Sequence, residues 1–181
     1  MSWSLGDASA PTSPVVQTVE MRDHLRIVGG ADDDYISGLV AAATSYLQQY
    51  TGRLIYTQTI VEYVDAFPDE RELPLHCYPI TSVVLKYYNE DDTLTTMSAS
   101  DYWVHTAKKP CSVEIKDVWP TTKNRAGAVR VEITGGDALP LADVRHAIKI
   151  IVGFWFEQPD ETQINIPAAA KALMLQHRIF R

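Results

Sequence analysis

The stretch HLRIVGGADDDYISGLVAAATSYLQQYTGR, from His24 to Arg53, decides the fold of the first part of this chain. A short helix is expected over Val19–Arg26, with Thr18 as its N-cap, and it breaks at Gly29-Gly30. A long helix then begins at the acids Asp32-Asp33-Asp34, whose negative charges interact favourably with the helix dipole. The apolar residues that follow recur at a 3.6-residue period and predict an amphipathic helix: Tyr35, Ile36, Leu39, Val40, Ala43, Tyr46, Leu47 and Tyr50.

Composition bounds the class of protein. With 181 residues, of which 46% are apolar, the chain is long enough for one folded domain with an arm. The net charge of -7 argues against a general DNA-binding surface. Cys77 and Cys111 lack metal-ligand spacing, and free thiols are favoured over a disulfide. We find neither a membrane-spanning run nor an export signal, so we expect a protein made in a cytoplasm.

After Gly52, a predicted helix C-cap, the pattern changes to a period of two. The clearest alternation is in 128–134, where Val129, Val131 and Ile133 share one face. These patterns predict an antiparallel, half-buried sheet. The candidate strands are 57–64, 80–88, 101–106, 112–115 and 128–134.

Helix returns at Pro140, and the run from Val144 to Phe156 is apolar on almost all sides, so we expect it to be the most buried helix. Pro167 starts a final helix. The sequence predicts an α+β fold, in which a helical bundle core carries an antiparallel β-sheet insertion between its second and third helices. The expected organisation is a flexible N-terminal arm over 1–16 and a single domain over 17–181, divided into helical 17–53, β-rich 54–137 and helical 138–181.

The chain shows no motif that carries catalysis, a metal or a cofactor. Asp32-Asp33-Asp34 lacks the Gly and Glu of a calcium loop, and the Gly pairs lack the pattern of a phosphate loop. His76 and Cys77 are adjacent in sequence, which in a strand directs them to opposite faces. We therefore expect a protein that is not an enzyme and has no catalytic, metal or cofactor-binding residues. An enzyme site assembled from His105, Cys111 and distant acids stays open as an alternative.

The order of several short motifs resembles the tailed-phage head–tail connector (head-completion adaptor) family, in its long form with a β-rich insertion. The resemblance spans about 16–181, and departs from the family at Gly135-Gly136-Asp137, where family members often have Gly-Tyr. The motifs, in chain order, are HLR (His24–Arg26), YTGR (Tyr50–Arg53), TQT (Thr57–Thr59), LP (Leu73-Pro74), PITSV (Pro79–Val83), DY (Asp101-Tyr102), WP (Trp119-Pro120), VRV (Val129–Val131), WFE (Trp155–Glu157), IP (Ile166-Pro167) and Arg178.

The resemblance implies a structural virion protein at the neck. Such proteins form a ring of identical copies, expected to be a dodecamer, beneath the portal protein; they extend the DNA channel and provide the platform for a stopper or tail-completion protein. DNA would pass without sequence-specific binding, and no membrane is involved. The alternative is a non-catalytic phage regulatory or host-interaction module.

Two sets of residues are candidate contact sites. The C-terminal helix carries apolar anchors and a cationic end, the ingredients of helix-in-groove binding, and its portal-docking residues would be Leu173, Leu175, Arg178, Ile179, Phe180 and Arg181. Packing of this segment on its own bundle is the alternative. Candidate ring-interface residues are Trp3, Arg53 and Trp119.

Overall fold

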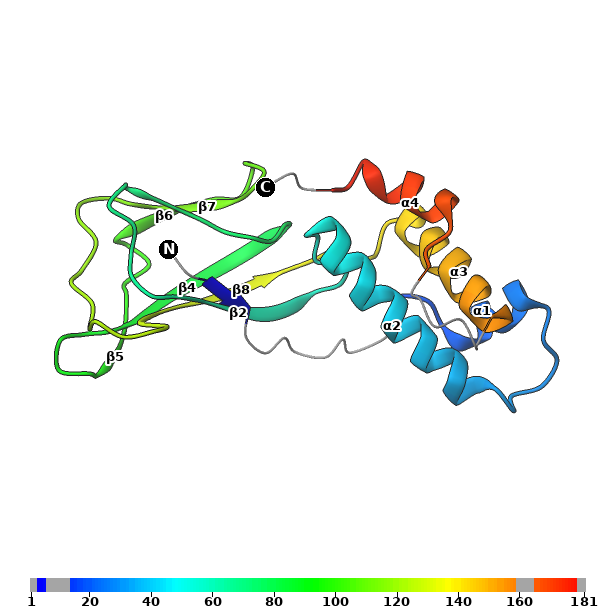
Figure 1. The fold of residues 1–181 in the computed structure, drawn as a ribbon. Helices are drawn as coiled ribbons and strands as arrows, with labels where there is room; N and C mark the ends of the chain where they lie inside the picture. Colours follow the sequence, from blue (N-terminus) through cyan, green and yellow to red (C-terminus); the bar gives the residue numbers. More distant parts are fainter. Residues whose placement is uncertain (1–2, 6–13, 159–164, 179–181) are drawn as a thin grey trace. The chain divides into compact units, whose positions relative to one another are not determined.

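The computed structural model describes residues 3–5, 14–158 and 165–178 (Figure 1). Contacts divide the chain into two compact units. The helical unit contains the described residues of 11–56 and 137–178, and the β unit contains 57–136 together with the N-terminal strand. Each unit has its own buried core.

The helical unit is built from α1 (Thr18–Leu25), α2 (Asp33–Thr51), α3 (Ala142–Glu157) and α4 (Ala168–Leu175). The helices α2 and α3 run antiparallel: the rings of Tyr35 and Phe156 lie 5.8 Å apart at one end, and Arg53 pairs with Asp137 at the other. Ile36, Val40, Ala43 and Leu47 of α2 face a matching stripe on α3. That stripe consists of Val144, Ala147, Ile148, Ile151 and Val152.

The connection between α1 and α2 is held by Arg22. Its Nη1 donates to the Gly29 carbonyl oxygen at 2.8 Å, and its Nε lies 3.5 Å from Asp33 Oδ1. Arg26 ends α1 in the left-handed region at φ 58°, and Gly29 adopts φ +95°, a conformation that favours glycine. The predicted break at the glycine pair is therefore a defined turn.

The β unit contains two antiparallel sheets. The five-stranded sheet has the order β1-β2-β8-β4-β5 and the three-stranded sheet the order β3-β7-β6. The strands are β1 (Trp3–Leu5), β2 (Gln58–Val64), β3 (Glu72–Pro74), β4 (Ile80–Tyr88), β5 (Leu94–Thr96), β6 (Tyr102–His105), β7 (Ser112–Ile115) and β8 (Val129–Gly135). Tyr102 of β6 donates its hydroxyl to the Val83 carbonyl of β4 at 2.9 Å, which joins the two sheets.

The α+β fold with a β insertion between α2 and α3 is confirmed, with several differences in detail. β8 is buried at every second residue, as its alternation predicts. The strands β3 and β5 were not predicted, and the insertion is two sheets, because strand pairing depends on long-range contacts. Gln17, not Thr18, is the N-cap of α1, and its N–H donates to the Glu20 carboxylate.

Parts of the predicted flexible arm over 1–16 have defined positions. The backbone of Trp3–Leu5 pairs with Glu62–Val64 at the edge of β2. Val15 and Val16 are buried in the helical core, because two adjacent apolar side chains beside α1 gain more from burial than from solvent. The arm therefore contributes residues to both units.

Candidate functional site

Three histidines scattered in the sequence each pair with a carboxylate. His76 Nδ1 lies 3.1 Å from Oε2 of the buried Glu62, whose other oxygen accepts the His76 backbone N–H. His105 Nε2 lies 2.8 Å from Glu114 Oε2, and His177 Nε2 lies 2.5 Å from Asp143 Oδ2. The His105 pair joins β6 to β7, the His76 pair joins the segment after β3 to β2, and the His177 pair joins the turn after α4 to α3, so each has a structural explanation.

The alternative of an enzyme built on His105 and Cys111 finds little support in the geometry. The Cys111 thiol is buried and donates to the carbonyl oxygens of Thr106 and Lys108, each at 3.5 Å. Burial raises the pKa of this thiol, which disfavours the reactive thiolate. Cys77 is also a free, buried thiol.

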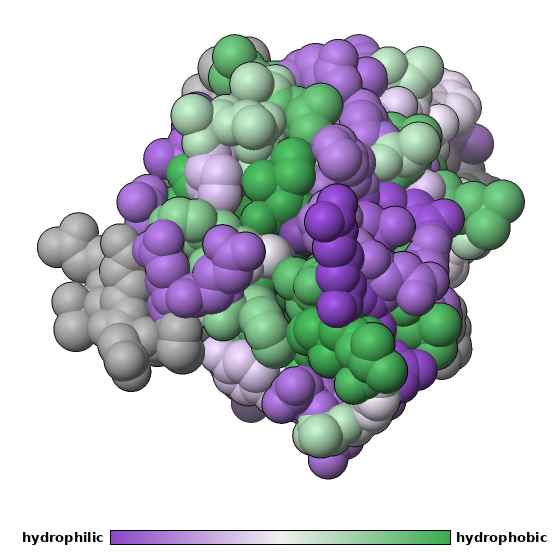
Figure 2. Space-filling model, turned by 90° about the vertical axis from the view of Figure 1, so that its right-hand side faces the viewer, coloured by the Kyte–Doolittle hydropathy of each residue, from purple (hydrophilic) through white to green (hydrophobic). Residues whose placement is uncertain are grey.

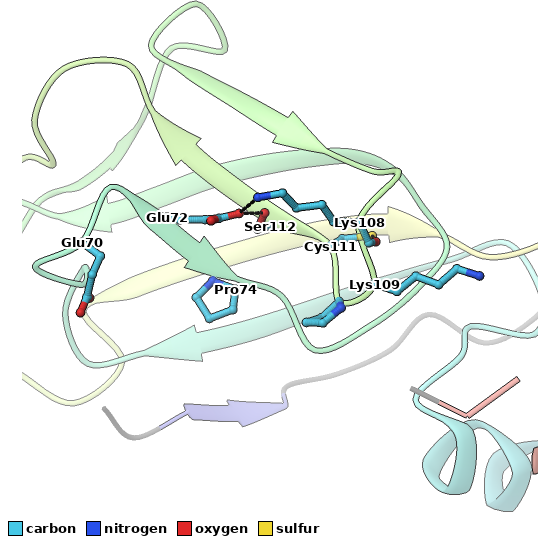
Figure 3. A pocket seen from close by; sticks show the side chains of 8 residues that line it. Glu70, Glu72, Pro74, Lys108, Lys109, Cys111 and Ser112 are labelled. Atoms are coloured by element: carbon cyan, nitrogen blue, oxygen red, sulfur yellow. Dashed lines mark hydrogen bonds and ion pairs between the residues drawn. The ribbon is translucent and has the colours of Figure 1, made fainter. Parts of the chain in front are cut away.

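One hollow belongs to the β unit, beside β3 and β7 (Figure 3). It has a volume of about 680 Å³, and Glu72 lies in it with bonds to Lys108 and Ser112. The bonds from Lys108 and Ser112 lower the pKa of Glu72. A carboxylate held ionised by a lysine and a hydroxyl is an ion pair of the surface, and it lacks the raised pKa of a general acid.

The acids at the start of α2 act at the helix terminus. Asp33 and Asp34 lie in the first turn, and Asp33 pairs with Arg22. Across residues 3–5, 14–158 and 165–178 no group of three metal-ligating side chains comes together. In the same described residues, no helix is long and apolar enough to cross a membrane.

Two of the candidate ring-interface residues, Arg53 and Trp119, make contacts within the chain. Arg53 makes a two-pronged contact with Asp137, with Nε and Nη2 at 2.9–3.2 Å from its carboxylate oxygens. Trp119 stacks on Phe67 at 4.6 Å and donates its Nε1–H to the Glu70 carbonyl. The side chain of Trp3 lies outside the described residues. These contacts anchor turns, and a role between subunits stays a prediction.

The C-terminal segment packs partly on its own bundle. Met174 is buried and Leu173 half-buried against the helical core, while Leu175 is 53% exposed. His177 and Gln176 both contact Asp143, and the Arg178 guanidinium lies 5.2 Å from the centre of the Tyr50 ring. Ile179, Phe180 and Arg181 lie outside the described residues. Among the candidate docking residues that the structure describes, Leu175 is thus the exposed apolar one.

Sequence reasoning missed a basic recess between α1 and α3. It has a volume of about 300 Å³ and is lined by Glu20, Ala142, Arg145, His146 and Lys149. Arg145 Nη2 lies 2.6 Å from Glu20 Oε2, and Lys149 Nζ lies 3.6 Å from its other oxygen. Burial, then Lys149 and His146, lowers the pKa of the neighbouring His24. Sequence spacing places Arg145, His146 and Lys149 on one helix, but it does not connect them with Glu20.

Comparison with solved structures shows that the fold is shared with chains of gene transfer agent (GTA) particles. The chain superposes with a TM-score of 0.82 on a chain of the neck of an empty GTA particle computed with C6 symmetry, at 20% identity over 98% of this chain and 96% of that one. A chain of the native GTA virion gives 0.81 at 19% identity, and one of the native GTA neck computed with C12 symmetry gives 0.81 at 17%, each with the same coverage.

The family model of the phage gp6-like head-tail connector protein matches residues 17–117, which is more than half of the sequence. The chain therefore belongs to the gp6-like head-tail connector family, as its motifs predict. This is a family of structural connector proteins. No curated protein matches the sequence.

Proposed function

We propose that this protein is a connector of a virion neck, where identical copies form a ring beneath the portal protein. The ring would extend the DNA channel and provide the platform for a stopper or tail-completion protein. The observation that carries the proposal is the agreement between the family match and a fold shared over 98% of the chain with proteins of symmetric GTA necks. The expected copy number is twelve, since one of those necks was computed with C12 symmetry.

The charge of the chain supports a passive role toward DNA. A net charge of -7 gives little reason for phosphate binding, and a weakly repulsive wall lets DNA pass without sticking. The histidines that contact carboxylates and the buried Cys111 thiol, whose pKa is raised, support a structural role over an enzymatic one. A monomeric regulatory or host-interaction module would share these properties, so assembly is the distinguishing measurement.

The test is to mix the purified chain with the portal protein of the same particle and to measure the mass of the complex by native mass spectrometry. The proposal predicts a ring of chain copies on each portal, and density for this chain between head and tail in electron micrographs of purified necks. A chain that stays monomeric with portal and is missing from purified necks would favour the regulatory module.

A further inference from the structure

One end of the helical unit exposes apolar side chains beside acids. Val28 is 99% exposed although Arg22 holds the turn around it, and Tyr35 is 46% exposed on the first turns of α2. Asp32 and Asp34 are exposed beside them. We call Val28, Asp32, Asp34 and Tyr35 the acidic end. Figure 2, drawn from the side of the α1–α2 turn, shows hydrophobic residues between hydrophilic ones on this face.

The other end of the helical unit exposes apolar side chains beside cations. Leu139 is 85% exposed and Leu141 36% exposed, immediately before α3. The basic recess follows within the first two turns of α3, where Arg145 and Lys149 together face the single carboxylate of Glu20 and His146 is exposed. We call Leu139, Leu141, Arg145, His146 and Lys149 the basic end.

The two surfaces are separate. Tyr35 contacts Phe156 in the last turn of α3, whereas the basic end lies at its first two turns. The 16 residues of α3 span about 24 Å. Because Arg22 fixes the turn that carries Val28, this apolar side chain is presented without a large ordering cost on binding.

We propose that the acidic end of one copy packs against the basic end of the next copy around the ring. This inference rests on the proposed function. A closed ring of identical chains needs two different surfaces that complement each other on every copy. The two ends supply them, since each carries exposed apolar area for burial. At the acidic end the exposed Asp32 and Asp34 outnumber the exposed Arg26. At the basic end Arg145 and Lys149 outnumber Glu20, and Asp143 is already bound to Gln176 and His177, so the excess charges of the two ends are opposite.

A charge-swap experiment tests this pairing. Asp34→Lys makes the acidic end repel the basic end of its neighbours, and His146→Glu makes the basic end repel theirs. Each variant alone should associate at least about tenfold more weakly than the parent chain. An equal mixture should recover assembly, because in alternating copies the introduced lysine faces the introduced glutamate at one interface, and Asp34 faces His146 at the next. A ring of twelve or six copies has room for this alternation.

The readout is the association constant from sedimentation velocity and the ring mass with portal, with melting temperatures to confirm folding. Asp32→Lys with Lys149→Glu is a second pair that repeats the swap with different side chains. Asp91→Lys, in the exposed β4–β5 turn, is the matched control and should assemble like the parent chain.

The outcomes separate the two proposals. The pairing of these ends is wrong if the single variants assemble normally, or if their mixture does not recover assembly. Neither result contradicts the proposed ring. Loss of portal binding with normal association of the chain would assign the recess to the portal and likewise overturn the pairing. A parent chain that forms no ring with portal overturns the proposed function and the pairing with it.

Discussion

At the scale of single residues, charged side chains from distant positions hold the helix ends together. Arg53 follows the C-cap Gly52 of α2, and Asp137 precedes α3, so their contact closes one end of the antiparallel helix pair. The side chains are only 11% and 20% exposed. The guanidinium fork matches the carboxylate, and this geometry distinguishes arginine from lysine.

We expect Arg53→Lys to destabilise the fold almost as much as Arg53→Ala, by about 2 kcal/mol, because either change removes the fork from a largely buried carboxylate. This corresponds to a loss of about 4–8 °C in melting temperature for a chain of this size. Asp137→Ala in the Arg53→Ala background should cost little more, since the partner is already lost. A lysine variant that melts with the parent chain would contradict the role of the fork.

The pair of His177 and Asp143 should make the free energy of unfolding depend on pH in the acidic range. Burial alone would raise the pKa of Asp143, but the hydrogen bonds from His177 and the Val144 N–H outweigh it and hold the pKa below the usual 3.8. A lowered pKa in the folded state contributes stability that is present above 3.8 and lost as pH falls through the folded value.

The free energy of unfolding measured in urea should therefore fall more for the parent chain than for Asp143→Asn as the pH is lowered below about 5, because the asparagine cannot titrate at this position. The comparison within one buffer series isolates the contribution of this carboxyl from those of the other acids. Equal pH dependence of the two proteins would show that Asp143 has an ordinary pKa in the folded state.

At the scale of elements, α3 is the centre of the helical core, but only along one stripe. Ile151 is fully buried, whereas Trp155 is half-buried and donates its Nε1–H to the Asn165 carbonyl at 3.2 Å. The sequence predicts burial on almost all sides of this helix. The exposed parts of Trp155 and Phe156 show that its last turn lies at the edge of the core.

Ile151→Ala should cost about 2–5 kcal/mol in the free energy of unfolding, because a cavity remains in a closed core. Trp155→Ala should cost less, since solvent can reach the vacated space. Chemical denaturation of both variants with the parent chain measures the order. If the tryptophan variant is the less stable of the two, the edge of the core is packed more tightly than its exposure indicates.

Elements that carry their own pattern could be predicted from the sequence, and elements defined by their partners could not. The alternation of β8 and the period of α2 are local signals, and both elements lie within a residue or two of their predicted bounds. The strand β3 has three residues including Pro74, and its pairing with β7 defines it. The basic recess combines Glu20 with Arg145, 125 positions apart, and no sequence spacing connects them.

At the scale of the whole molecule, both units expose apolar side chains on their surfaces. The β unit exposes apolar side chains such as Trp103 and Val118, and the Lys116 ammonium group lies 5.1 Å from the centre of the Trp103 ring. In the helical unit, exposed apolar residues stand beside charges at both ends of α3 and at the end of α4. We therefore expect the helical unit to make contacts with other proteins.

We expect the end of α4 to dock on the portal protein. Truncation after Gln176 removes His177, Arg178 and the residues beyond, but leaves Met174 in the core, so the protein should stay folded by circular dichroism. It should no longer co-purify with portal.

In the full chain, Leu175→Asp should have the same effect on binding without lowering the melting temperature, because the side chain is already exposed. Ala169→Asp, exposed at a different angle of the same helix, is the control. If the truncated protein and Leu175→Asp both bind portal normally, this segment only packs on its own bundle.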